Sequence, residues 1–271
     1  MRALGLDIGS RAVKAAFLEV GRPPLLKVAP GGWDPLQVCE SLLAGERWDA
    51  LAVTGYGRQV GARHFGCAAL TELKAVARGA HALHPVTRGA VDVGGQDTKA
   101  LSLDAGGRLQ KFTLNDRCAA GTGRFLEVMA TAMGLRLGEF IEAALEAEEG
   151  ETLSSVCAVF AESEVVSLIG RGAPRDRLAL GIHRAVARRT LAMASSLSLD
   201  GPVLFTGGGA LNRCLARELS AGGLDLRQTA HPQHVAAIGC ALVAAGLEAA
   251  GAGMDWVRSD SQAQWSSNSR K

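Results

Sequence analysis

The sequence predicts an α/β protein made of two related halves. Apolar segments with strand character alternate with helical segments along the chain, which is typical of α/β folds. One hairpin pattern also occurs twice: residues 3–17 and 89–103 both contain an apolar strand, an aspartate, a glycine turn and a second apolar strand. A repeat of this kind, with the copies about 85 residues apart, indicates two half-domains that face one another.

The first half contains strand and helix signals in alternation. The expected elements are, in order, strand 2–10, antiparallel strand 12–20, helix 36–48, strand 49–57 and helix 71–83. Apolar runs define the strands, whereas the helical segments repeat apolar residues at intervals of three and four. Thr71 is the expected N-cap of the last helix, because a threonine hydroxyl accepts a hydrogen bond from a free helix N–H group.

The second half opens with the repeated hairpin and continues into two segments that place a cysteine before a helix. Cys118 precedes the turn of "CAAGTGRF", and Cys157 precedes "AVFAESEVVS". The expected helix caps are Asn115 or Asp116 for the first helix and Ser154 or Ser155 for the second. The start of a helix favours a thiolate, because it offers free N–H groups and a partial positive charge. The alternative for each cysteine is a buried packing role.

Each hairpin has the residue types of a phosphate site. Asp7 and Asp92 end the first strands, and the turns contain Gly9 in one hairpin and Gly94 and Gly95 in the other. Glycine lets backbone N–H groups approach an anion closely, and a strand-end aspartate can hold a hydrated Mg²⁺. A simple tight turn is the alternative for either hairpin alone, whereas the two together favour a phosphate clamp.

A third glycine element, "VLFTGGGALNRCLARELS" at residues 203–220, is expected to be an apolar strand, the turn Gly207, Gly208 and Gly209, and then a helix. The absence of side chains there suits a flat adenine or ribose against the backbone, and close packing of strand on helix is the alternative. The chain has no GxxxxGK[ST] and no strand followed by GxGxxG. A P-loop is therefore excluded, and a dinucleotide fold is disfavoured.

Composition excludes several other classes. The chain has 271 residues and a net charge of +2, so no basic field indicates nucleic acid or an anionic membrane. No apolar run approaches the ~20 residues of a membrane span, and a charge comes too early for a signal peptide. Six scattered cysteines without CxxC are expected to be thiols or ligands rather than disulfides. We therefore expect a cytoplasmic protein.

The ordered motifs DIGS, DVGGQD and TGGGA resemble those of the actin, Hsp70 and sugar kinase superfamily. Over about residues 3–247 the chain is similar to the BadF/BadG/BcrA/BcrD family. The segments that carry this similarity are "GLDIGSRAVK", "VDVGGQDTK", "NDRCAAGTGRFLE", "CAVFAESEVVSLIGRG" and "TGGGALN". The resemblance implies an α/β, two-lobed actin/Hsp70/hexokinase-like (ribonuclease H-like) ATPase fold with mixed sheets flanked by helices.

We place the N-terminal lobe, with the first phosphate hairpin, at residues 1–88. The C-terminal lobe, with the second hairpin, Cys118, Cys157 and the adenosine motif, is expected at residues 89–251. Residues 252–271 are polar and low in aliphatic side chains, and we expect a disordered tail there.

The family includes activators of 2-hydroxyacyl-CoA dehydratases and ATPase subunits of benzoyl-CoA reductase. The resemblance therefore implies an ATP-hydrolysing iron–sulfur protein that delivers low-potential electrons to a catalytic dehydratase or reductase component. The implied cofactors are ATP or ADP, Mg²⁺ and one [4Fe–4S] cluster per dimer, with Cys118 and Cys157 of each subunit as ligands. The implied partners are a second copy or a paralogous subunit, the catalytic component, and ferredoxin or flavodoxin as electron donor.

The motifs assign roles within the nucleotide site. Asp7 and Asp92 are expected to orient Mg²⁺ through water, and Gln96 or Asp97 to position the attacking water. The sequence does not separate Gln96 from Asp97, and an outward position on its strand is the alternative for Lys14. The expected nucleotide-binding residues are Gly9, Ser10, Lys14, Asp92, Gly94, Gly95, Gly207, Gly208 and Gly209.

Two other functions share this lobe architecture. A small-molecule kinase of the sugar-kinase type would need a carboxylate base near a sugar site and could lose its cysteines without effect. An actin-like assembly protein would polymerise with ATP and contain no iron. The short chain, without an obvious insertion domain for a substrate, counts against the kinase, and the contexts of Cys118 and Cys157 count against the filament.

Overall fold

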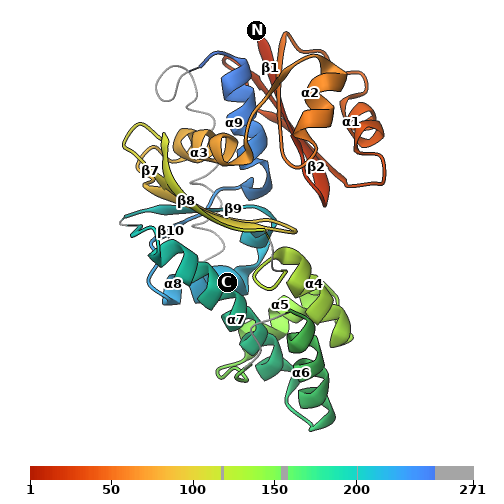
Figure 1. Cartoon of the computed structure of the whole chain (residues 1–271), viewed down its shortest axis with the longest axis vertical. Coiled ribbons are helices and arrows are strands. Elements are labelled where there is room, and N and C mark those ends of the chain that lie inside the picture. Colours follow the sequence, from red (N-terminus) through yellow and green to blue (C-terminus); the bar gives the residue numbers. More distant parts are fainter. Residues whose placement is uncertain (117–118, 154–157, 200, 248–271) are drawn as a thin grey trace.

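The computed structural model describes residues 1–116, 119–153, 158–199 and 201–247. Two five-stranded sheets are each flanked by helices, with the first sheet in the upper part of Figure 1 and the second in the middle. Their strand orders are β3-β2-β1-β4-β5 and β10-β9-β6-β7-β8. In each sheet one half pairs antiparallel and the other half parallel, so the two sheets have the same topology. The two predicted hairpins, β1-β2 and β6-β7, are confirmed.

The first sheet consists of β1 (Arg2–Ile8), β2 (Ala12–Glu19), β3 (Leu25–Pro30), β4 (Ala50–Thr54) and β5 (Ala68–Ala69). Its helices are α1 (Pro35–Leu43), α2 (Arg58–Phe65) and α3 (Glu72–Leu83). Thr71 caps α3 as predicted, since its side chain accepts a hydrogen bond from Lys74 N–H. The helix predicted to reach residue 48 ends at Leu43, and Gly45 follows with a left-handed φ of 78° that a continuing helix does not allow.

The second sheet consists of β6 (Gly89–Val93), β7 (Thr98–Leu103), β8 (Leu109–Asn115), β9 (Val203–Thr206) and β10 (Leu226–Arg227). Helices α4 (Gly123–Ala132), α5 (Leu137–Glu146), α6 (Ala158–Gly170), α7 (Arg175–Ser195) and α8 (Arg213–Ala221) accompany it. Two short 3-10 helices, η1 (Gly208–Leu211) and η2 (Pro232–His234), follow β9 and β10. The predicted strand, glycine turn and helix of residues 203–220 are thus present, with η1 between strand and helix.

Helix α9 (Val235–Ala244) returns the chain to the first sheet, where it contacts β1, β2 and β4, and it also packs on α3. A side chain at Gly79 would overlap the carbonyl of Val235, and one at Gly239 would overlap that of Ala75, so α3 and α9 touch through glycine. One apolar cluster contains residues of α3, α9 and both sheets. The two sheets therefore share a helical layer (Figure 1).

The predicted cap of the helix after Cys118 is wrong. Asn115 ends β8, and its amide donates to the carbonyl of Ala120, whereas α4 begins at Gly123 with Thr122 as its N-cap. Residues 119–122 thus precede the helix, and Thr122 is the last of them. Cys118, Cys157, Ser154 and Ser155 lie outside the described residues, as does the predicted tail. The lobe boundaries stay a prediction.

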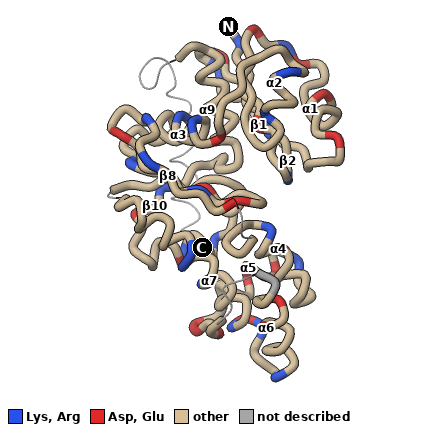
Figure 2. Tube along the Cα trace, in the orientation of Figure 1, with Lys and Arg blue, Asp and Glu red and all other residues tan. Residues whose placement is uncertain are grey.

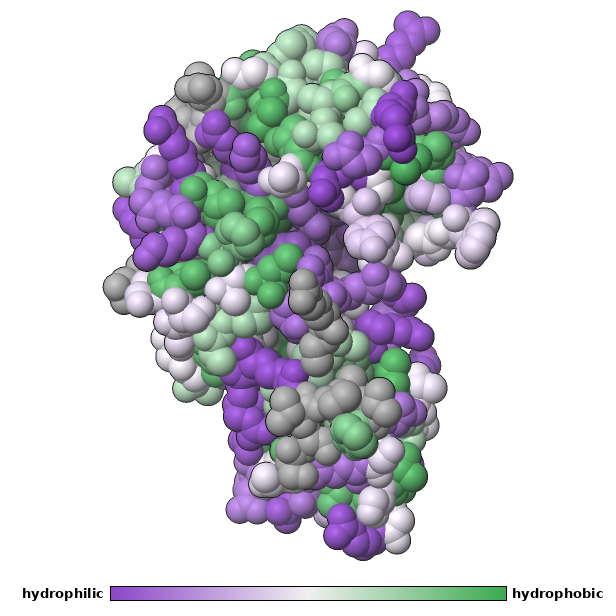
Figure 3. Space-filling view, in the orientation of Figure 1, coloured by the Kyte–Doolittle hydropathy of each residue, from purple (hydrophilic) through white to green (hydrophobic). Residues whose placement is uncertain are grey.

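Charges of both signs are interspersed over both lobes (Figure 2), in keeping with the small net charge. Within the described part of the chain, no helix is long and apolar enough to cross a membrane. Figure 3 shows that the surface is hollowed between the two lobes and that hydrophilic residues surround the hollow.

Candidate nucleotide-binding site

A cavity of about 480 Å³ lies where the two hairpins and the glycine turn after β9 converge. All described residues that the sequence assigned to the nucleotide line it, although they come from segments far apart in the chain. They are Asp7, Gly9, Ser10, Lys14, Asp92, Gly94, Gly95, Gln96, Asp97, Gly207, Gly208 and Gly209. Further lining residues, which the sequence reasoning did not assign to the nucleotide, include Arg11, Tyr56, Glu72, Glu127, Asn212 and Gln233.

The first hairpin holds a buried ion pair at the cavity. Asp7 and Lys14 are register partners on β1 and β2, and Lys14 Nζ donates to Asp7 Oδ2 at 3.1 Å. Burial opposes the charge on Lys14, but the carboxylates of Asp7, Asp92 and Glu72 together outweigh it, Asp7 most of all, and raise the pKa of the lysine. The position on the outer face of its strand, left open for Lys14, is therefore wrong: its side chain is on the cavity side.

The second hairpin holds a larger network around Lys99. Lys99 is the register partner of Asp92, and its Nζ lies 2.8 Å from Asp97, 2.9 Å from Glu72 and 3.6 Å from Asp92. The lysine side chain is only 3% exposed, so these carboxylates hold it charged and raise its pKa, although burial alone would lower it. The hairpin repeat contained a signal for this residue, because Lys99 occupies the place of Lys14.

Glu72 brings a further carboxylate to the cavity from the start of α3. Burial is the main cause that raises its pKa to about 7, and the neighbouring Asp7, Asp92 and Asp97 add to this effect against the pull of Lys99. Sequence reasoning missed Glu72 because it lies in a helix whose spacing indicates only packing. Its place in the site comes from the way α3 begins beside both hairpins.

The carboxylates suit a hydrated magnesium ion. Asp7 Oδ1 is buried and has no hydrogen-bond partner among the described residues, while Thr206 Oγ1 donates to Asp92 Oδ2 at 2.6 Å. Within the same residues, no three His, Cys, Asp or Glu side chains form a group that could hold a metal ion. Mg²⁺ commonly keeps several waters and takes one or two carboxylates with substrate phosphates, so the residues fit the water-mediated contact predicted for Asp7 and Asp92.

The glycines after β9 allow close packing and also leave space beside the cavity. Gly207 has a φ of 82°, and a side chain there would overlap the carbonyl of Val93, while one at Gly209 would overlap the Val93 side chain. These two glycines therefore allow close packing on β6. A Cβ at Gly208 would meet only Gln233 Nε2, at 3.6 Å, so this position leaves open space beside the cavity.

The second hairpin is bonded directly to the start of α4. The carbonyls of Gly94 and Gly95 accept hydrogen bonds from the N–H groups of Gly123 and Arg124, each at 2.9 Å. Thr98 Oγ1 donates to the carbonyl of Gly121 at 2.6 Å. Three hydrogen bonds thus join this hairpin to the helix that follows the Cys118 motif and to the turn before it.

Two lobes with equivalent aspartate hairpins around one cavity define a nucleotide-binding protein of the two-lobed ATPase type. The chain belongs to the BadF/BadG/BcrA/BcrD ATPase family, whose model matches residues 43–244. This membership identifies it as an ATPase and supports ATP binding. The predicted fold class, an actin/Hsp70/hexokinase-like ATPase fold, is confirmed by its likeness to solved structures.

Three similar proteins illustrate the family. The chain is 38% identical over 257 residues to the activator of lactoyl-CoA dehydratase from Anaerotignum propionicum, covering 90% of this chain and 97% of that protein. It is 30% identical to one of the benzoyl-CoA reductase subunits of Thauera aromatica, covering 88% and 91%. The solved activator of 2-hydroxyisocaproyl-CoA dehydratase from Clostridium difficile, with bound ADPNP, is 36% identical with a TM-score of 0.83 over 90% of this chain and 94% of that one.

Proposed function

We propose that this chain hydrolyses ATP between its two hairpins and thereby gates the delivery of low-potential electrons from a shared [4Fe–4S] cluster to a partner enzyme. The observation that carries the proposal is the pair of equivalent aspartate hairpins that line one cavity in a member of this ATPase family. Its relatives include a dehydratase activator and a reductase component. The proposed partner is therefore an acyl-CoA dehydratase or an aromatic acyl-CoA reductase.

The nucleotide would lie along the cavity with its phosphates between the hairpins and its adenosine beside Gly207–Gly209. Asp7 and Asp92 would hold Mg²⁺ through water, and hydrolysis then depends mainly on positioning and charge stabilisation. Lys99 holds the carboxylate of Asp97 at 2.8 Å, which favours Gln96 as the residue that positions the attacking water.

Cys118 and Cys157 are the proposed cluster ligands. Their assignment rests on the sequence motifs, since both lie outside the described residues. A four-thiolate cluster needs two such chains, and a twofold axis would supply four ligands from two copies or from this chain and a paralogous subunit. When bound, the cluster would supply one-electron transfer, with ferredoxin or flavodoxin as the proposed donor.

The hydrogen bonds from Gly94 and Gly95 to α4 support a coupling between nucleotide and cluster. Loss of the terminal phosphate would change the forces on the second hairpin, and α4 begins shortly after Cys118. The proposed gate is thus a two-state element whose equilibrium the nucleotide biases.

Iron analysis tests this proposal. Protein purified without oxygen is expected to contain about two irons and two acid-labile sulfides per chain, as half of a shared four-iron cluster requires. Cys118→Ala and Cys157→Ala are each expected to lose the iron and the [4Fe–4S] absorption, whereas the half-buried Cys67→Ala serves as the matched control and should keep both.

The same experiment separates the leading function from the kinase alternative. An iron-free protein after anaerobic reconstitution, with ATPase activity indifferent to both cysteine substitutions, would refute the electron-transfer proposal. A screen of small-molecule phosphate acceptors would then test a kinase. Iron in the wild type that survives both substitutions would refute the ligand assignment alone.

A further inference from the structure

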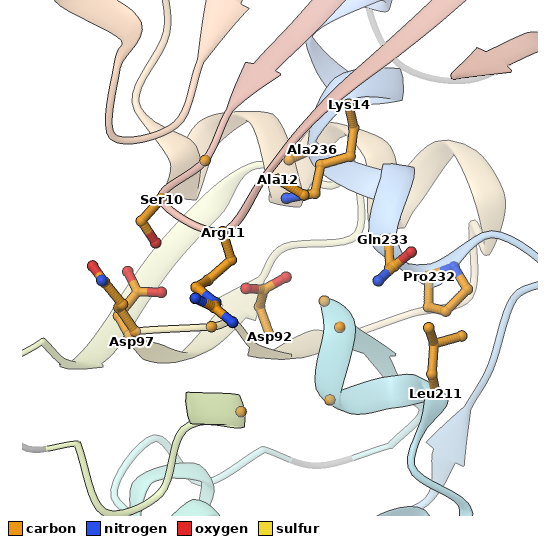
Figure 4. A pocket seen from close by; sticks show the side chains of 18 of the residues that line it. Ser10, Arg11, Ala12, Lys14, Asp92, Asp97, Leu211, Pro232, Gln233 and Ala236 are labelled. Carbon is orange, nitrogen blue, oxygen red and sulfur yellow. The ribbon is translucent and has the colours of Figure 1, made fainter. Parts of the chain in front are cut away.

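Arg11 joins the two lobes at the mouth of the cavity. It follows Ser10 in the turn of the first hairpin, and its Nη2 atom donates to Glu127 Oε2 on α4 at 2.7 Å. Both residues line the cavity although they are 116 positions apart. Figure 4 shows Arg11 reaching from the first hairpin toward the strand end that carries Asp92 and the turn that carries Asp97.

The stem of Arg11 also lies against the second hairpin. A side chain at Gly95 would overlap Cγ of Arg11, so the glycine leaves room for the arginine between the two turns. Because both turns are proposed to bind phosphate, the guanidinium lies where the two phosphate-binding segments meet.

The surroundings of the ion pair between Arg11 and Glu127 allow each residue to change its partner. The Arg11 side chain is 48% exposed and that of Glu127 is 35% exposed, so water partly screens their attraction. Glu127 Oε2 also accepts a hydrogen bond from Arg124 Nη1 at 3.1 Å within α4. Glu127 would therefore keep a cationic partner on its own helix if Arg11 moved away.

We propose that Arg11 binds the terminal phosphate of ATP and that Glu127 is its competing partner. The proposal rests on the proposed function, because it requires that the cavity takes ATP. A planar guanidinium binds phosphate oxygens in pairs through charge-assisted hydrogen bonds, and a terminal phosphate offers more negative charge than one carboxylate. Exchange from Glu127 to phosphate releases α4 from the first hairpin, so the bridge between the lobes depends on the terminal phosphate.

Competition makes two predictions of opposite sign. Arg11→Ala is expected to weaken equilibrium binding of a non-hydrolysable ATP analogue with Mg²⁺ by about ten-fold, as for a lost charged hydrogen bond, and to change ADP binding by less than about two-fold. Glu127→Gln is expected to tighten binding of the analogue by about two- to five-fold, because the competitor for Arg11 is gone. Arg11→Lys keeps the charge but not the paired geometry and should lie between wild type and Arg11→Ala.

The matched controls are Arg22→Ala and Glu19→Gln, because Arg22 Nη1 and Glu19 Oε2 form an exposed ion pair of 3.2 Å and neither residue lines the cavity. Both variants should leave the two affinities unchanged. Weaker binding in Arg11→Ala and Glu127→Gln alike would make the pair a passive clamp and overturn the proposal. Equal losses for ADP and the ATP analogue in Arg11→Ala would also overturn it. If the wild type bound neither nucleotide, the proposed function itself would fail, and the inference with it.

Discussion

Lys14 and Lys99 hold equivalent places in the two hairpins, yet their surroundings differ. Lys14 pairs with the single carboxylate of Asp7, whereas Lys99 gathers Glu72, Asp92 and Asp97 around one buried ammonium group. Carboxylates that crowd together without a cation repel one another, and burial makes each charge costlier. The second hairpin therefore depends on Lys99 more than the first depends on Lys14.

Replacement of Lys99 is expected to destabilise the fold strongly. Lys99→Met keeps the length of the side chain but leaves three carboxylates without their shared cation, at a cost of about 3 kcal/mol in the free energy of unfolding. Denaturant unfolding of wild type and variant measures this difference. Lys111→Met, at an exposed position of β8, is the control and should change stability by less than about 0.5 kcal/mol. Similar losses for the two variants would contradict the network account.

Among the elements, α7 and α8 are joined by the buried His183 of α7, which bonds to the N-cap residue of α8. His183 Nδ1 lies 2.8 Å from the carbonyl of Ala179, so this nitrogen bears the proton, and Nε2 accepts from Asn212 Nδ2 at 2.9 Å. Asn212 Oδ1 in turn caps α8 by accepting from Leu215 N–H. Because Nε2 accepts a hydrogen bond, His183 fits this site only as neutral imidazole. The ring also packs beside Phe140 of α5.

Because His183 is buried as neutral imidazole, the folded protein is expected to lose stability in acid. Burial lowers the pKa of His183 to about 4, against the opposing hydrogen bond to Ala179, while the unfolded chain titrates near its ordinary value of about 6.5. The unfolded state thus binds the proton first, so stability is full above pH 6.5 and falls as the pH drops toward 4. Between pH 7 and 5 the loss from this site is about 2 kcal/mol.

Denaturant unfolding of wild type and His183→Gln at several pH values checks this loss of stability. The stability difference between wild type and variant should shrink by about 2 kcal/mol from pH 7 to pH 5, because only the wild type has the buried imidazole. His231→Gln, at an exposed position, should show no comparable change. A difference that stays constant with pH would mean that His183 accepts a proton without cost in the folded state.

Local sequence patterns were sufficient to predict some of the helices and strands. The β1-β2 and β6-β7 hairpins, α3 with its Thr71 cap, and the strand, turn and helix of residues 203–220 follow from local periodicity and turn residues. The cap predicted at Asn115 or Asp116 failed because Asn115 completes β8, and pairing with Thr98 on β7 keeps it extended. A strand partner far away in sequence thus overrode a local capping preference.

On the scale of the molecule, α3 and α9 form the layer between the two sheets. The apolar cluster there contains Leu18 of the first sheet, Leu101 and Leu204 of the second, and Val76 and Ile238 of the two helices. The core of the first lobe includes α9, which lies near the end of the described chain. Residues 1–88 therefore do not contain a complete core.

A fragment of residues 1–88 is therefore expected not to fold. Without α9, the faces of β1, β2 and β4 that it covers would be exposed to water. Thermal unfolding followed by circular dichroism should show no cooperative transition for this fragment. The same fragment joined through a flexible linker to residues 235–247 should regain one. Cooperative unfolding of residues 1–88 alone would show that the first lobe is an independent unit.

The sequence by itself determined the hairpins, the glycine turn after β9 and the set of residues suited to phosphate. These depend on alternating apolar residues, on glycine and on strand-end aspartates, all of which act within a few positions of the chain. Only the tertiary structure decided that Glu72 meets Lys99, that Arg11 meets Glu127, and that α9 returns to the first sheet. Such contacts join distant segments, so they follow from how the two sheets and their shared helices pack, which no local pattern encodes.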